Sequence, residues 1–177
     1  MKRILAVLVE NHLGVLTRVA GLIRRRGFNI ESLAVGVTDS PEISRITLVV
    51  DGDELQVEQV SKQLAKLIEV LQVLELDAAN AVARELALVK VQSDPVRRPQ
   101  ILQLAQVFRA NVVDVGTHSV TIEVTGTHDK VEALLNLARE FGVQEVVRTG
   151  VIAMERGPGA VRFDREDNMY DQNVLRV

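Results

Sequence analysis

Residues 4–16 read ILAVLVENHLGVL, a continuous apolar run followed by a short polar segment and a glycine. The apolar run predicts a strand that is covered on both faces of a sheet. After the glycine, the apolar residues recur at helical spacing as far as Arg26, which predicts an amphipathic helix. A strand that turns into a helix in this way presents free backbone N–H groups at one spot, where the helix dipole favours an anion. We therefore predict a loop at Glu10–Leu16 that binds a small carboxylate.

The rest of the first half completes one compact unit. Two β-rich segments, Ile30–Thr38 and Ile43–Val50, are joined by turn-forming residues and predict a hairpin. A second helical stripe begins after Asp53, and Gly27 is placed to end the first helix. With a closing strand at Val70–Leu76, the predicted order is βαββαβ.

The second half repeats this order. The expected elements are a strand at 85–91, a helix around 101–108, strands at 112–115 and 120–125, a helix, and a last strand at 143–153. Asp129 and Glu132 have the spacing of a helix cap, and Gly142 is placed to end that helix. We predict an α+β fold of two ferredoxin-like βαββαβ sandwiches in tandem.

The predicted boundaries are a domain at 1–77, a short linker at 78–83, a domain at 84–155 and a charged, flexible tail at 156–177. In each sandwich two helices cover one face of the sheet. The other face carries enough apolar residues to need a partner domain or subunit, so we expect an oligomer.

Composition excludes several classes of protein. The chain has 177 residues, 47% of them hydrophobic, a formal net charge of −3 and no cysteine. The charge gives no reason to expect nucleic acid or an acidic membrane as a partner, and no apolar stretch has membrane-spanning length. The absence of cysteine fits a reducing cytoplasm, which is the expected location. An RNA-recognition module shares the βαββαβ order, but it stacks bases on sheet aromatics, and aromatics make up only 3% here.

Several motifs together resemble a known family. They are residues 10–16 (ENHLGVL), residues 26–33 (RGFNIESL), residues 44–47 (SRIT), residues 88–91 (LVKV) and Gly150-Val151. The first three resemble the amino-terminal ACT domain of the regulatory, small subunit of acetolactate synthase (acetohydroxyacid synthase). The resemblance continues through the second half up to the tail.

The resemblance implies a chain that has no catalytic residue, metal or cofactor of its own. It implies a catalytic large subunit as partner, which carries thiamine diphosphate, a divalent metal and flavin, and a homodimer formed through the ACT domains. It also implies feedback inhibition by valine, or a related branched-chain amino acid, bound between two ACT domains. Gly36 matches a family position that often carries another small residue. The effector-binding residues implied are Asn11, His12, Leu13, Gly14, Val15, Asn29, Ile30 and Gly36.

Simpler interpretations stand beside these. Gly14 could be only a turn glycine, Asn11 a helix cap, and Asn29 a residue that satisfies a strand end. The three histidines share no ligand spacing, and the basic run Arg24–Arg26 is more typical of a solvated helix end than of an interface. No acid–base pair or activated nucleophile is visible. The alternative function is a stand-alone ACT-type sensor that controls another enzyme or a transcriptional response.

Overall fold

The computed structural model of the chain describes residues 2–159 and 161. The described residues form two compact units. The first contains the chain up to Val82 together with the described residues from Ile152 onward, and the second contains Ala83–Val151.

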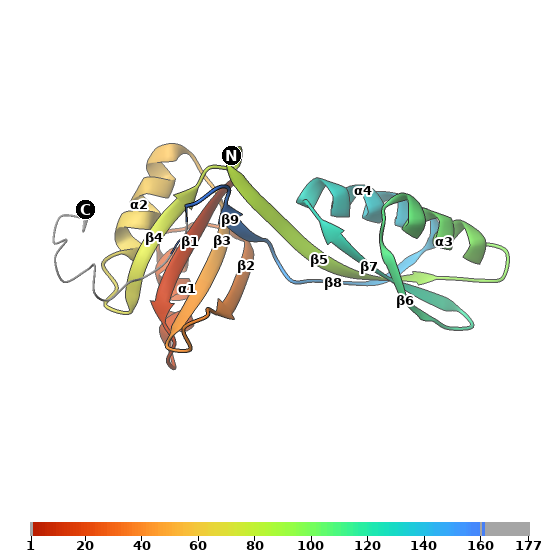
Figure 1. The fold of residues 1–177 in the computed structure, drawn as a ribbon, viewed down its shortest axis with the longest axis horizontal. Coiled ribbons are helices and arrows are strands. Elements are labelled where there is room, and N and C mark those ends of the chain that lie inside the picture. Colours follow the sequence, from red (N-terminus) through yellow and green to blue (C-terminus); the bar gives the residue numbers. More distant parts are fainter. Residues whose placement is uncertain (1, 160, 162–177) are drawn as a thin grey trace. The chain divides into compact units, whose positions relative to one another are not determined.

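The first unit is an α+β sandwich in the predicted order (Figure 1). Its four strands form an antiparallel sheet in the order β2-β3-β1-β4, so the apolar strand at the start of the chain is central, as predicted. The elements are β1 (Lys2–Glu10), α1 (Val15–Arg25), β2 (Ile30–Val37), β3 (Ile43–Asp51), α2 (Glu54–Leu64) and β4 (Val70–Leu76).

Local sequence explains where both helices begin or end. Gly27 has φ +74°, and after it Phe28 N–H donates to Ile23 O at 3.3 Å, the Schellman ending that the glycine predicted. At the start of α2, the Asp53 carboxylate accepts from Gln56 N–H at 2.8 Å, and Gln56 Oε1 accepts from Asp53 N–H at 2.9 Å. This reciprocal capping box satisfies two of the free donors at the helix start.

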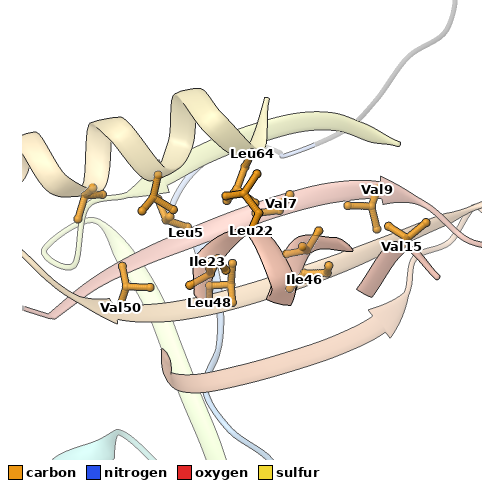
Figure 2. Close-up of a cluster of buried hydrophobic side chains, with 13 residues drawn as sticks. Leu5, Val7, Val9, Val15, Leu22, Ile23, Ile46, Leu48, Val50 and Leu64 are labelled. Atoms are coloured by element: carbon orange, nitrogen blue, oxygen red, sulfur yellow. The ribbon is translucent and has the colours of Figure 1, made fainter. Parts of the chain in front are cut away.

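The core of the first unit lies between the sheet and the two helices. Figure 2 shows the alternate residues of the two central strands, among them Leu5, Val7 and Leu48, pointing toward apolar residues of α1 and α2 such as Ile23 and Leu64. These five side chains are fully buried. The strand period of two and the helix period of 3.6 place them on one shared face.

Part of the opposite face of this sheet is covered by a strand from the end of the described chain. The expected strand at 143–153 is interrupted near Gly150, where φ is +81°, into β8 (Val143–Arg148) and β9 (Ile152–Glu155). Strand β9 belongs to the first unit, contacts β1 and β4, and accepts a hydrogen bond from Arg45 Nη2 to Ala153 O at 2.6 Å. Partial burial lowers the pKa of the Arg45 guanidinium. The single long strand was therefore wrong. The predicted bounds 84–155 of the second domain stay a prediction, because β9 groups with the first unit but pairs with β5.

The second unit repeats the sandwich, with sheet order β6-β7-β5-β8. Strand β5 starts at Ala81, so the last part of the predicted 78–83 linker is strand, and only the turn at 78–80 precedes it. The cap of α4 is Thr127, whose Oγ1 accepts from Lys130 N–H at 3.4 Å, and not Asp129 as predicted. Gly142 ends the helical segment at φ +86°. The elements are β5 (Ala81–Gln92), α3 (Arg98–Val107), β6 (Asn111–Val115), β7 (Ser119–Gly126), α4 (His128–Ala138), the 3₁₀ turn Arg139–Phe141, and β8.

Candidate ligand-binding site

The loop between β1 and α1 is fixed at its start and open at its tip. Glu10 N–H donates to Glu69 O at 2.9 Å, and Asn11 N–H donates to Glu42 O at 2.8 Å. The Asn11 side chain also donates, from Nδ2 to Pro41 O at 2.8 Å. These bonds tie the loop to the start of β4 and to the β2–β3 turn. Leu13, by contrast, is 100% exposed.

The first turn of α1 offers its backbone N–H groups outward. The N-cap residue of α1 is Gly14, at φ +89°, which has no side chain to cap the helix. A Cβ added at this position would have no atom within 4 Å. Neither a side-chain cap nor an acidic residue is present in this turn among the described residues. The helix dipole and the free donors therefore act on whatever anion lies there. Glycine is the only residue type that adopts this φ freely and, because it has no side chain, leaves the approach of a ligand to the helix start open.

The structure changes the interpretation of Asn11 and adds neighbours that the sequence did not indicate. Asn11 does not cap α1, because the cap is Gly14, and one N–H of the Asn11 amide donates to Pro41 O. Its second N–H and its Oδ1 remain available to a ligand. His12 Nε2 lies 3.1 Å from Glu10 Oε2, so the loop carries a carboxylate and an imidazole in contact. Arg18 on α1 forms an ion pair with Glu69. No local motif signals these two contacts, because each partner is ordinary by itself.

The predicted residues on β2 lie at two different ends of the sheet. Ile30 pairs with Val50, which is level with Arg3 at the start of β1. Gly36 pairs with Arg45, near the end of the sheet that carries the β1–α1 loop. At about 3.3 Å per residue, the strand length between the two ends is roughly 20 Å. Within one chain, Asn29 and Ile30 are therefore far from Asn11–Val15 and Gly36.

Other surfaces of the described residues give no competing centre. No group of three or more His, Asp or Glu side chains in the described part could hold a metal ion. A groove of about 470 Å³ lies along α2 and beside the end of α1, but none of the predicted effector residues lines it. Among the described helices, none is long and apolar enough to cross a membrane. The groove is lined by Arg26, Phe28, Gln56, Gln59 and Gln63.

The tandem α+β sandwiches define the class: a protein built from ACT-type domains. The comparisons with known proteins identify the family more narrowly. Residues 5–72 match the model of the AHAS small subunit-like ACT domain, and residues 84–157 match the model of the small subunit of acetolactate synthase. The chain belongs to the family of acetolactate synthase small subunits.

Individual relatives agree over almost the whole chain. The chain is 55% identical over 157 residues to the probable acetolactate synthase small subunit of Archaeoglobus fulgidus, covering 89% of this chain and 98% of the relative. It is 50% identical to the acetolactate synthase small subunit of Mycolicibacterium smegmatis, with 89% and 92% covered. A crystal structure of the acetolactate synthase small subunit from Thermotoga maritima superposes with a TM-score of 0.84 at 42% identity, covering 89% of this chain and 98% of that one.

Membership confirms the resemblance and the α+β tandem fold that the sequence predicted. The ACT domain supports a regulatory role, and the term small subunit implies a catalytic large subunit as partner. Branched-chain amino-acid biosynthesis, which includes the valine and isoleucine pathways, follows from the family name. The residues that bind an effector, and the effector itself, stay predictions.

Proposed function

We propose that this chain activates the catalytic subunit of acetolactate synthase and makes it sensitive to feedback inhibition by valine or a related branched-chain amino acid. The catalytic subunit would carry thiamine diphosphate, a divalent metal and flavin. The observation that carries the proposal is the uncapped start of α1 at Gly14, open to solvent and free of acidic residues. The cytoplasmic location also stays a prediction.

The chemistry of the loop suits an α-amino acid. The effector carboxylate would accept hydrogen bonds from the first N–H groups of α1, while Asn11 and Asn29 offer amide groups and an apolar wall takes the isopropyl group. Burial of a valine side chain contributes about 1.5–3 kcal/mol, and each charge-assisted hydrogen bond about 1.5–3 kcal/mol. After ordering costs, roughly −4 to −6 kcal/mol remains, which is the millimolar to sub-millimolar range of a metabolite sensor.

Two copies of the chain would bring the predicted site together. Among the described strands, β2 pairs with β3 alone, and its outer edge carries Val35 and Val37, which are 48% and 60% exposed. If the β2 strands of two copies pair antiparallel about a two-fold axis, the Asn29 end of one copy lies beside the Gly36 and loop end of the other. The separation of these residues within one chain thus supports a homodimer as the binding species.

The direct test is acetolactate formation by the matching catalytic subunit, with and without this chain, across a valine titration. We expect the chain to stimulate the catalytic subunit and valine to reverse the stimulation. Inhibition by leucine or isoleucine in place of valine would identify the related effector. Absence of stimulation by a folded chain that binds an amino acid would overturn the proposal and leave the stand-alone sensor as the function.

A further inference from the structure

One residue, Glu69, holds both ends of the β1–α1 loop. It lies directly before β4, and its backbone O accepts from Glu10 N–H at 2.9 Å, where the loop begins. Its carboxylate forms an ion pair with Arg18 Nη1, on the first turns of α1, where the loop ends. The backbone N–H of Arg18 in turn donates to Gly14 O at 3.0 Å, the bond that closes the first turn of the helix.

The burial of this pair is uneven. The Glu69 side chain is 9% exposed, whereas the Arg18 side chain is 64% exposed. A carboxylate removed from water is costly unless a cation or several donors accompany it. Loss of the Arg18 guanidinium from Glu69 would leave a buried carboxylate unpaired, so the ion pair is favoured. It holds α1 against the start of β4, while the tip of the loop is not held.

We propose that the Arg18–Glu69 ion pair is a positioning clamp that fixes the first N–H groups of α1 in place for the carboxylate of the effector. The inference rests on the proposed function, because it assigns the site an α-amino acid ligand. Neither side chain contacts the ligand in this proposal. The clamp raises affinity because donors that are already in place lose less conformational freedom on binding.

Electrostatics and positioning predict opposite signs for one substitution. Glu69→Gln removes a negative charge near the start of α1 and leaves the Arg18 cation in place. If charge alone mattered, the site would become more positive and would bind a carboxylate more tightly. If the clamp matters, the loop loosens and the ligand binds more weakly. The direction of the change therefore decides between them.

The experiment measures L-valine binding to the full chain by calorimetry, and hydrogen exchange of residues 10–18 without ligand. For Glu69→Gln we expect affinity to fall about five- to tenfold and exchange in the loop to become faster. The matched control is Glu75→Gln on β4, the strand that Glu69 precedes, where Glu75 Oε1 pairs with Arg3 Nη1 at 2.9 Å toward the opposite end of the sheet. This control is expected to change affinity by less than about twofold. If Glu69→Gln does not fold, Arg18→Lys, which keeps a cation over the buried carboxylate, replaces it in the same two measurements of valine affinity and loop exchange.

Several results would overturn the clamp. Unchanged or tighter valine binding in Glu69→Gln would do so, as would an equal loss of affinity in Glu75→Gln. Weaker valine binding in Glu69→Gln without faster hydrogen exchange in residues 10–18 would show that the effect does not pass through the loop. If the wild-type chain binds neither valine nor leucine nor isoleucine, the proposed function fails. The clamp is then judged by exchange alone, and equal loop exchange in the two Gln variants refutes it.

Discussion

Substitution of Gly14 by aspartate is the sharpest test of the effector site. A Cβ added at this position meets no atom within 4 Å, so steric clash at Cβ is not the expected effect. The backbone is at φ +89°, which costs a non-glycine residue about 1 kcal/mol. For a separation of about 6 Å between the new carboxylate and the effector carboxylate, and an effective dielectric constant of 20–40, the repulsion is roughly 1.4–2.8 kcal/mol. Because the loop is exposed, we take the lower value, which corresponds to about a tenfold loss of valine affinity.

The assay is the valine concentration for half-maximal inhibition of the reconstituted complex. The control is Gly157→Asp, since Gly157 has φ +83° and an equally open surround, and therefore imposes the same backbone strain without a charge at the loop. A second control, Gly14→Ala, adds the strain at the loop without the charge. We expect the half-inhibitory concentration to rise about tenfold in Gly14→Asp and to change little in Gly157→Asp. Equal inhibition of Gly14→Asp and wild type, with the complex intact by co-elution, would refute the site.

Three further predictions follow from other contacts. Arg45→Met removes the hydrogen bond to β9 and is expected to cost about 1 kcal/mol of unfolding free energy and to speed hydrogen exchange at 150–156; unchanged exchange there would contradict the role of Arg45. The backbone N–H of Arg97 donates to the Asp94 carboxylate and holds its pKa below the ordinary 3.8. The ionised Asp94 carboxylate stabilises the fold at pH values above its ordinary pKa and ceases to do so as the pH falls through its lowered pKa. Asp94→Asn should therefore reduce the acid sensitivity of unfolding, measured by circular dichroism. Unchanged unfolding at low pH would argue against this role of Asp94. Val37→Lys places a charge on the outer edge of β2 and should shift sedimentation toward monomer, whereas an intact dimer would place the interface elsewhere.

Much of the fold was predictable because local rules and tertiary contacts agree. The continuous apolar run before Glu10 fits a central strand, and Gly27 fits the end of α1. The closing strand β4 has the bounds that its apolar pattern predicted, Val70–Leu76. The second unit was predicted with one wrong cap, since Thr127 and Asp129 are both acceptable cap residues and only the start of α4 distinguishes them.

The rest depends on contacts between distant residues. Arg18 and Glu69 are 51 positions apart, and Asn11 and Pro41 are 30 apart, so neither contact has a local signature. The return of β9 to the first unit was also hidden, because the apolar pattern after Gly142 continues past Gly150. A glycine in a β-rich segment predicts a possible bend, but it does not show with which sheet the next strand packs.

The position of Asn29 has a consequence for how inhibition depends on protein concentration. If the effector contacts the loop of one copy and the β2 start of another, it binds the dimer and not the monomer. Linkage then requires that valine strengthen the dimer by the same factor by which dimerisation strengthens valine binding. Dilution of the chain below its dimer dissociation constant should therefore raise the valine concentration needed for half-saturation, and valine should in turn slow subunit exchange. A half-saturation point that is independent of chain concentration, measured across the monomer–dimer transition, would mean that one chain binds the effector alone. Because Asn29 is roughly 20 Å from the loop within one chain, it would then have no part in the site.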